Sequence, residues 1–442
     1  MRRYVIIGSG VAGVAAAEAI RGQDPRGDLL MIGTEPEGYY SRPGLAFYLT
    51  GELSEKQLKP LPDRYFAGLG LQQLLGNVVR VHPAAHQVEL EHGGCIEYDR
   101  LLIATGAAAA SPRLKGLQAK GVVKLDSITD ARNILRLAHS ARVAVVVGGG
   151  ITALEIVEGL VAQRVRTHYF LRGDRYWSNV LDETESRLVE DRLREHGVKI
   201  HFHTDLGEII EDGGRLVGVR TGDGRNLPCD LLGYAIGVRP RKEFAEASGI
   251  PCERGILVDE NLQTNAEDIF AAGDVAQVYD PFTGESVLDS LWGPAREQGH
   301  VAGLNMAGHR QAYRKPLPFN VTRLAGLTTT IIGAVGRGDD LDLVGIARGD
   351  SEVWRQLPDA IAAQANFDVN RLRVMIGQRS LIGAMLIGDQ TLSLALQHLI
   401  TRQVDISPIR ERLLQPNAPL ADLLAETWAE YQAGVRYAAQ QS

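Results

Sequence analysis

The sequence is poor in cysteine, in excess positive charge and in long apolar runs. Its three cysteines, Cys95, Cys229 and Cys252, lie far apart and form no CxxC pair, which argues against a disulfide scaffold, a zinc ribbon and a local dithiol redox centre. Lys and Arg number 47 against 54 Asp and Glu, for a net charge of −7, so we expect no nucleic-acid partner bound through bulk positive charge. No apolar run reaches the roughly 18 residues of a spanning helix, and we predict no membrane span.

The composition that remains is that of a globular protein. Apolar residues make up 45% and charged residues 23% of the 442 residues, and at ~150 residues per domain this length predicts about three domains. The N-terminus, with Arg2 and Arg3 before an apolar stretch, superficially resembles a signal peptide. Regularly spaced glycines and Glu18 interrupt that stretch, so we interpret it as mature protein and expect a cytoplasmic location.

Two segments share the order strand, glycine-rich turn, helix, strand. The first strand is predicted at residues 4–7 and its turn at 8–13, and the pattern returns with a strand at 142–147 and a turn at 148–150. The helices are predicted at 14–21 and 152–163, and the second strands at 29–32 and 166–171. Two such openings predict two nucleotide-binding units rather than one.

The rest of the chain connects and extends these units. A buried strand at 101–106 leads into a predicted crossover at 107–112, and residues 231–240 have the same pattern and are typical of a crossover back. Beyond Pro316 and Pro318 the pattern favours β-hairpins, at 328–335, 343–347 and 371–387, and then helices at 392–401 and 420–437. We expect a third, α+β domain with a helical tail.

The first turn reads GSGVAG from Gly8 to Gly13 and matches GxGxxG. Gly8 permits the tight turn, Gly10 lets the backbone approach a pyrophosphate, and Gly13 lets the helix pack close to the sheet. The positive N-terminus of the helix then faces the anion. Glu35 stands roughly 20 residues further on, where a carboxylate accepts ribose hydroxyls. The turn and Glu35 together predict a dinucleotide site.

The second turn reads GGGITA from Gly148 to Ala153, the variant with alanine last. Arg172 stands at the end of the next strand, where a ribose-binding acid would be expected, and Arg175 follows it. A guanidinium binds phosphate bidentately, so this pattern favours a 2′-phosphate and therefore NADPH. A second interpretation stays open, in which the two arginines form a solvated surface pair that Asp174 partly neutralises.

A third segment, TNAEDIFAAGD from Thr264 to Asp274, ends an apolar strand with a carboxylate. Asp274 lies just past the carboxyl end of that strand, where open α/β sheets bind their ligands. A lone Gly-Asp pair is usually only a turn. The segment is informative because the two dinucleotide motifs precede it.

With an ATG segment at residues 104–106, these motifs make the chain resemble the FAD- and NAD(P)H-dependent pyridine nucleotide oxidoreductases over nearly its whole length. The resemblance implies an α/β fold of two Rossmann-like nucleotide-binding domains, the second inserted in the first, plus a C-terminal α+β interface domain with a helical tail. We predict the FAD-binding domain at 1–110 and 241–315, the NAD(P)H-binding domain at 111–240, and the interface domain at 316–442.

The resemblance also implies which residues contact the cofactors. Those implied to contact FAD are Gly8, Gly10, Gly13, Glu35, Thr105, Gly106 and Asp274, and those implied to shape the nicotinamide site are Gly148, Gly150, Ala153 and Glu155. The other predicted cofactor-binding residues are Val11, Ala12, Arg42, Pro43, Val78, Arg172, Arg175, Gly237, Gly273 and Ala295. Hydride transfer between the cofactors demands no protein acid or base, so we name no catalytic residue, and we predict no metal site.

Finer motifs indicate a subfamily. YYSRPGL from Tyr39 to Leu45 and VDISPIR from Val404 to Arg410 resemble rubredoxin reductases and the flavin portion of assimilatory nitrite reductases. By that resemblance Arg42 pairs with an FAD phosphate, and the alternative is a charge on a surface loop. Relatives that reduce disulfides or peroxides carry a cysteine in this segment, where the chain has only Ser41, Arg42 and Pro43.

We therefore expect an enzyme that takes hydride from NAD(P)H onto FAD and passes electrons to an external acceptor, a small redox protein, without a redox-active cysteine. The alternatives are a peroxide-forming NAD(P)H oxidase and a non-catalytic flavin or nucleotide sensor. A homodimer is expected through the C-terminal domain, where leucines supply apolar surface, unless these leucines only pack the domain's own core. The leucines are Leu392, Leu394, Leu396 and Leu399.

Overall fold

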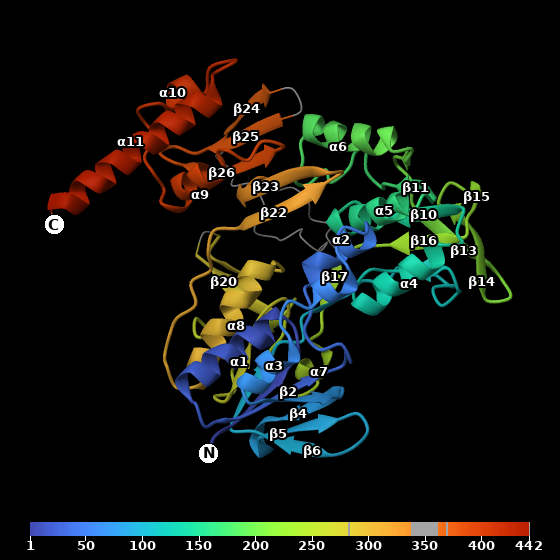
Figure 1. Ribbon diagram of the computed structural model, residues 1–442, viewed down its shortest axis with the longest axis vertical. Coiled ribbons are helices and arrows are strands. Elements are labelled where there is room, and N and C mark those ends of the chain that lie inside the picture. The colour runs from blue at the N-terminus through green and yellow to red at the C-terminus, as the bar shows by residue number, and fades with distance from the viewer. Residues whose placement is uncertain (282, 337–360, 368–369, 442) are drawn as a thin grey trace.

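The computed structural model describes residues 1–281, 283–336, 361–367 and 370–441 (Figure 1). Its first sheet has five parallel strands in the order β19-β7-β1-β2-β3. The strands are β1 (Arg3–Ile7), β2 (Asp28–Gly33), β3 (Leu71–Leu75), β7 (Arg100–Ile103) and β19 (Ile269–Ala271). Ile7 is in register with Ile32 and Ile103, so the carboxyl ends of the central strands align at one edge of the sheet.

Helices α1 (Val11–Gln23) and α8 (Trp292–Met306) pack against each other and against this sheet (Figure 1). Small residues allow the close contact. A Cβ built on Gly299 would lie 2.1 Å from the carbonyl oxygen of Ala12, and one on Gly303 would lie 2.5 Å from that of Ala16. The two backbones therefore touch directly along a shared seam, the α1–α8 seam.

A second parallel sheet has the order β12-β11-β10-β16-β9. Its strands are β9 (Val122–Val123), β10 (Val143–Val147), β11 (Arg166–Phe170), β12 (Lys199–His201) and β16 (Leu231–Tyr234), and its helices include α4 (Ile128–Ala138), α5 (Ile151–Ala162) and α6 (Glu183–Glu195). All five strands fall between β7 and β19 in the sequence. We call residues 111–240 the inserted segment.

The chain passes between the two sheets twice, and the two passages pair with each other. Strand β8 (Ala107–Ala109) runs antiparallel to β17 (Val238–Pro240). This pairing joins the two predicted crossovers side by side, directly beyond the carboxyl end of β7.

A third sheet follows the first two, in the order β22-β23-β26-β25-β24. Its strands are β22 (Phe319–Leu324), β23 (Leu327–Gly333), β24 (Ile361–Phe367), β25 (Asn370–Ile376) and β26 (Leu381–Ile387), and helices α9 (Ser393–Thr401), α10 (Arg410–Leu413) and α11 (Leu420–Gln441) follow it. The hairpin predicted at 371–387 becomes β25 and β26, whereas the strand predicted at 343–347 lies outside the described residues. Figure 1 shows α11 leading away from this sheet to the C-terminus.

Smaller elements complete the fold. Two three-stranded antiparallel sheets combine β4 (Val78–His82), β5 (Gln87–Leu90) and β6 (Cys95–Glu97), and β13 (Leu206–Asp212), β14 (Arg215–Thr221) and β15 (Asn226–Pro228). A mixed sheet has β20 (Ala276–Asp280) in its centre, parallel to β18 (Ile256–Leu257) and antiparallel to β21 (Glu285–Leu288). Short helices are α2 (Leu45–Leu49), α3 (Asp63–Gly68) and α7 (Glu243–Glu246). Among the described helices, none is long and apolar enough to cross a membrane.

Two local expectations need correction. Helix α1 begins at Val11 rather than at residue 14, because Gly13 belongs to its first turn instead of to the loop. Of the leucines expected to supply apolar surface, Leu396 and Leu399 are fully buried in the core of the C-terminal domain, whereas Leu394 is 62% exposed. Two of these leucines therefore pack their own domain, and the homodimer stays a prediction.

A buried ion cluster joins α6 to the third sheet. Arg373 of β25 donates through Nε and Nη2 to the two carboxylate oxygens of Glu185, at 2.8 and 2.9 Å, and Glu185 is fully buried. Arg371 donates to Asp182 at 2.5 Å. Because Asp182 and Glu185 also form the capping box of α6, this cluster fixes the start of that helix against β25.

Candidate flavin and dinucleotide site

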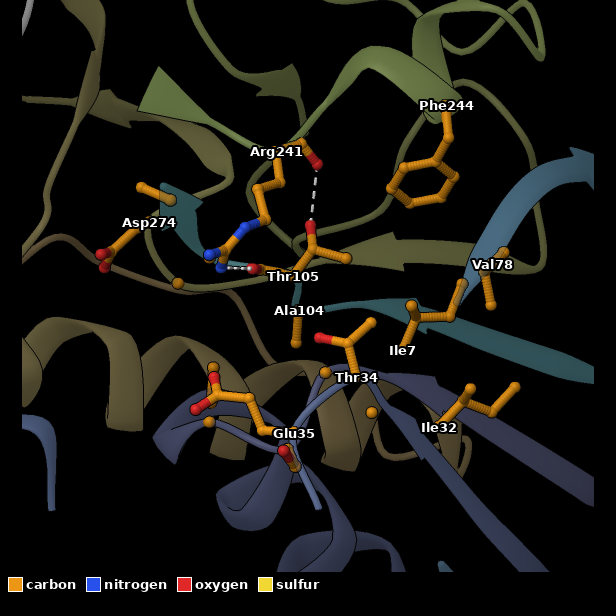
Figure 2. Close-up of a pocket in the computed structure, with 18 of the residues that line it drawn as sticks. Ile7, Ile32, Thr34, Glu35, Val78, Ala104, Thr105, Arg241, Phe244 and Asp274 are labelled. Atoms are coloured by element: carbon orange, nitrogen blue, oxygen red, sulfur yellow. Dashed lines mark hydrogen bonds between the residues drawn. The ribbon is translucent and has the colours of Figure 1, made fainter. Parts of the chain in front are cut away.

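A cavity of about 610 Å³ lies at the carboxyl edge of the first sheet, and we call it the sheet-edge cavity (Figure 2). It is the place where open parallel sheets bind ligands. Twelve of the predicted cofactor-binding residues line it: Gly8, Gly10, Val11, Ala12, Glu35, Arg42, Val78, Thr105, Gly106, Gly273, Asp274 and Ala295. Residues spread over nearly 300 positions of the sequence thus meet in one cavity.

The glycines of the first turn have the backbone roles expected of them. Gly8 has a φ of +119°, and a Cβ there would lie 2.1 Å from the carbonyl oxygen of Ala104. Gly13 does not line the cavity, because it packs beneath the turn, where a Cβ would lie 2.1 Å from the carbonyl oxygen of Gly8. Gly10 is the N-cap of α1, and no side chain caps this helix. The backbone N–H groups at the start of α1, from Val11 onward, therefore remain for an anion in the cavity, whereas the N–H of Gly8 donates to the carbonyl oxygen of Ile32.

Asp274 follows β19, the edge strand that pairs with β7, and its side chain lines the cavity (Figure 2). Its loop is held by Gln298, a fully buried residue of α8 whose Oε1 accepts the backbone N–H of Gly273 at 2.8 Å. Gly273 itself has a φ of +79°. Helix α8 therefore sets the position of the carboxylate that the sequence predicts for FAD.

Glu35 and Arg42 lie together rather than as two separate contacts. Arg42 Nη2 donates to Glu35 Oε1, and Tyr40 donates its hydroxyl to Glu35 Oε2 at 2.5 Å. Burial raises the pKa of Tyr40, and the carboxylate of Glu35 raises it further, so Tyr40 stays a hydroxyl donor at neutral pH. Glu35 and Arg42 still line the sheet-edge cavity. The predicted contacts of Glu35 with ribose and of Arg42 with phosphate stay predictions.

A second cavity of about 460 Å³ adjoins the first, and we call it the inter-unit cavity. It lies between α2, α5, the start of α8 and strand β22. Pro43 and Glu155, predicted as cofactor-binding, line it together with Trp292 of α8. Four residues line both cavities: Val11, Arg42, Asp274 and Ala295. We call these four residues the shared wall, and ligands held in the two cavities would adjoin each other there.

Glu158 adds an unpredicted carboxyl group to the inter-unit cavity, one helical turn after Glu155. Burial raises the pKa of Glu158 to about 7, while Arg323 and the backbone N–H of Gly326, which it accepts at 3.1 Å, act in the opposite direction. Between about pH 4.5 and 7 the native chain therefore holds a proton here that the unfolded chain, with an ordinary Glu pKa, has lost.

This shift makes stability fall as pH rises through the interval from about 4.5 to 7, by up to about 1.4 kcal/mol per pH unit for one proton. Glu158→Gln removes the titration and keeps an acceptor for Gly326. We expect the variant to melt above the parent at pH 8 and together with it at pH 4.5, by calorimetry. Glu97→Gln, at an exposed site of β6, is the control. A melting difference independent of pH would contradict the expectation.

Of the second glycine-rich turn, Ile151 lines the inter-unit cavity, and the other residues of the turn line neither of the two cavities. Gly148 has a φ of +142° and a Cβ there would lie 2.1 Å from the carbonyl oxygen of Ala235, and Gly150 is the N-cap of α5. Ala153 is fully buried, and Gly237 lines a small pocket with Thr152 and Tyr234. The turn thus has the geometry of the first one, including a helix N-terminus without a side-chain cap.

The two arginines after β11 differ from each other. Arg175 donates to both carboxylate oxygens of Asp174 at 3.1 and 3.2 Å and to the carbonyl oxygen of Ser178 at 3.2 Å. Arg172 is exposed. The sequence left open whether Asp174 partly neutralises the charge of the two arginines, and in the structure Asp174 pairs with Arg175.

Several cavity-lining residues were not predicted from the sequence. Arg241 and Phe244 line the sheet-edge cavity from the segment after β17 (Figure 2). Their signal in the sequence was weak, because they follow the predicted crossover, which ends at residue 240. No local pattern at 241–244 indicates that these side chains lie at the carboxyl edge of the first sheet. The antiparallel pairing of β17 with β8 brings them there.

Comparison with known proteins decides the family. The pyridine nucleotide-disulphide oxidoreductase family model matches residues 2–299, well over half of the chain. The chain belongs to this family. It is an NAD(P)H-dependent flavin oxidoreductase of the electron-transfer type, which confirms the resemblance predicted from the motifs.

Individual relatives cover most of the chain. Rhodocoxin reductase of Rhodococcus erythropolis is 32% identical, over 76% of this chain and 80% of its own. The epsilon subunit of NADH-dependent phenylglyoxylate dehydrogenase of Aromatoleum evansii is 26% identical over 96% of this chain and 98% of its own. A putidaredoxin reductase, solved as a covalent complex with putidaredoxin, superposes with a TM-score of 0.84 at 22% identity, over 96% and 99% of the two chains. That last match establishes the fold.

Proposed function

We propose that this protein oxidises NAD(P)H and delivers the electrons to a separate redox protein, with FAD in the sheet-edge cavity and the nicotinamide in the inter-unit cavity. The observation that carries the proposal is the wall that the two cavities share, formed in part by Arg42 and Asp274. A flavin and a nicotinamide must be in contact for hydride transfer, and the shared wall supplies the meeting point.

The residues of the sheet-edge cavity fit FAD. Gly8 and Gly10, which lack a Cβ, lead into an uncapped helix N-terminus, which suits a pyrophosphate, and the guanidinium of Arg42 adds positive charge. When bound, FAD supplies the hydride-accepting ring and passes electrons on. The chain's own part is to hold that ring: Pro43 stiffens the loop next to the shared wall, and Gln298 fixes the Gly273–Asp274 turn.

The mouth of the inter-unit cavity suits a protein acceptor. Trp292 and Val321 both line this cavity and are 46% and 52% exposed. Large apolar side chains exposed around one cavity are typical of protein contact sites. The relatives described above include a reductase named for its redox partner and a subunit of a larger dehydrogenase. A redox protein docked here would lie next to the shared wall.

The experiment that tests the function is an anaerobic titration of the FAD-loaded protein with NADH and NADPH, followed by turnover with ferredoxin, rubredoxin or oxygen. We expect rapid flavin bleaching and then fast reoxidation by an iron–sulfur or rubredoxin-type protein. Fast reoxidation by oxygen with peroxide release would favour the oxidase. Slow bleaching that changes the affinity for a partner protein would favour the sensor.

We further propose that no protein thiol takes part. The three cysteines line neither cavity, and burial raises the pKa of Cys229 to about 12, which leaves little reactive thiolate. The variant with all three cysteines changed to serine should reduce an artificial acceptor from NAD(P)H within about twofold of the parent rate. Circular dichroism and FAD content verify folding first, because Cys229 is buried. A folded, FAD-loaded variant that has lost its activity would reinstate a thiol mechanism.

For the choice of nucleotide we propose that Arg172 favours NADPH over NADH. Arg175 is engaged by Asp174 and Ser178, so the preference rests on Arg172. Losing one charged phosphate contact costs about 1.5–3 kcal/mol, roughly tenfold or more in affinity. Arg172→Ala should lower the NADPH-to-NADH ratio of kcat/KM by that factor, and Arg187→Ala on α6, which is exposed, should not. An unchanged ratio contradicts the proposal.

A further inference from the structure

Arg241 is a second guanidinium at the sheet-edge cavity, and the chain holds it from several sides. Its backbone N–H donates to the carbonyl oxygen of Gly106 at 2.9 Å, and its own carbonyl accepts the hydroxyl of Thr105 at 2.9 Å. Its Nη1 donates to the carbonyl oxygen of Thr105 at 3.2 Å. The side chain is 40% exposed and lines the cavity. Backbone and side chain are thus both anchored at the end of β7.

Asp126 of the inserted segment supplies the remaining anchor. Its Oδ2 accepts Arg241 Nη2 at 2.9 Å, and its backbone carbonyl accepts Arg42 Nη1 at 2.5 Å. Asp126 is only 3% exposed, and its own N–H donates to Asp130, at the capping box of α4, at 3.0 Å. One buried residue therefore orients two guanidinium groups toward the same cavity.

The two arginines are not equivalent. Arg42 makes an ion pair with Glu35, which also lines the cavity. Arg241 pairs instead with Asp126, which does not line the cavity. Two of the five N–H donors of Arg241 are engaged by Thr105 and Asp126, so its planar group retains donors for a ligand.

Figure 2 shows Arg241 and Glu35 on opposite sides of the cavity, with Asp274 to one side and Thr105 close to Arg241. The uncapped N-terminus of α1 lies on the side of Glu35, because a Cβ on Gly33, two residues before Glu35, would lie 3.0 Å from the side chain of Ser9, which precedes the N-cap of α1. An anion placed between these sides would receive backbone N–H groups from α1 and a prealigned guanidinium from the segment after β17.

We propose that Arg241 binds the pyrophosphate of FAD, opposite the N-terminus of α1, and that Asp126 positions it. The inference rests on the proposed function, because it takes FAD as the ligand of this cavity. A guanidinium held in a fixed plane matches phosphate oxygens bidentately and loses little conformational freedom on binding. The inserted segment thereby contributes to FAD binding through Asp126, in addition to its expected role with the nicotinamide nucleotide.

The test uses the full chain freed of FAD and measures equilibrium FAD affinity by flavin fluorescence, without NAD(P)H or any acceptor. Arg241→Gln keeps a donor for Asp126 and removes the charge, and we expect FAD binding to weaken roughly tenfold or more. Riboflavin, which lacks the pyrophosphate, serves as second probe and should bind the variant as it binds the parent. Arg239→Gln, two residues earlier and exposed, is the matched control and should leave both affinities unchanged.

The outcomes separate this inference from the function on which it rests. A parent chain that binds no FAD would overturn both. A parent that binds FAD, with equal affinities for the Gln variants at 241 and 239, would overturn the role of Arg241 alone, as would equal weakening for FAD and riboflavin. If Arg241→Gln does not fold, the phosphorus resonances of bound FAD decide: Arg241→Lys should shift them relative to Arg239→Lys, and coincident spectra would overturn the proposal.

Discussion

Glu185→Ala should lower the free energy of unfolding by about 3–5 kcal/mol, because it leaves Arg373 buried with its main charge partner removed. Arg373 is only 5% exposed and donates to both oxygens of Glu185. The carbonyl oxygens of Val335 and Val180, which it also contacts at 2.9 Å, do not neutralise its charge. Chemical denaturation of the FAD-loaded protein, followed by circular dichroism, measures the loss.

The control for this prediction lies on the same helix. Glu183 pairs with Arg187 at 2.6 Å on the exposed face of α6, where such a pair contributes about 0.3–0.5 kcal/mol. Glu183→Ala should therefore be nearly silent. If the two glutamate variants unfold alike, the buried cluster does not stabilise the contact between α6 and β25.

Gly13→Ala should yield a chain that purifies without FAD and loses about 1–3 kcal/mol of stability. The added Cβ would lie 2.1 Å from the carbonyl oxygen of Gly8 and 3.2 Å from the side chain of Ile6. Backbone cannot yield as a flexible side chain does, so the first turn must move away from α1. The absorbance ratio of flavin to protein after purification measures the loss of FAD.

Gly22 offers a matched control within the same helix. It lies near the end of α1, and a Cβ there would meet nothing within 4 Å. Gly22→Ala should keep FAD and gain up to about 1 kcal/mol, because alanine favours the helix. Full FAD occupancy in Gly13→Ala would show that the turn tolerates the shift and that this packing is not needed for binding.

Local patterns carried the parts of the fold that depend on neighbours in sequence. The strand at 4–7 and the turn after it were predicted nearly as they occur. A parallel strand that is covered on both faces appears in the sequence as a continuous apolar run, so it can be recognised without an alternation of apolar and polar residues. The boundaries differ where a residue serves two elements. Gly13 is both the last glycine of the motif and part of the first turn of α1.

The candidate site was predictable where a motif fixes the backbone and not where charges pair over long distances. Gly8, Thr105 and Asp274 were assigned from motifs, and all three line the sheet-edge cavity. The bond between Arg241 and Asp126 joins residues 115 positions apart, and the pair of Arg373 and Glu185 joins residues 188 apart. No local pattern marks such partners, since either arginine alone resembles a surface charge.

The α1–α8 seam has a consequence for how this protein tolerates change. Where side chains separate two helices, a larger residue on one is offset by a smaller residue on the other. At Gly299 and Gly303 the nearest atoms are main-chain atoms of Ala12 and Ala16, which no substitution can shrink. Saturation mutagenesis should therefore find these two glycines nearly invariant and beyond rescue by second-site changes, while the outer faces of the same helices accept most residues. The distance between the starts of the two helices, one at each cavity, is therefore set by contact between their main chains and not by the size of their side chains.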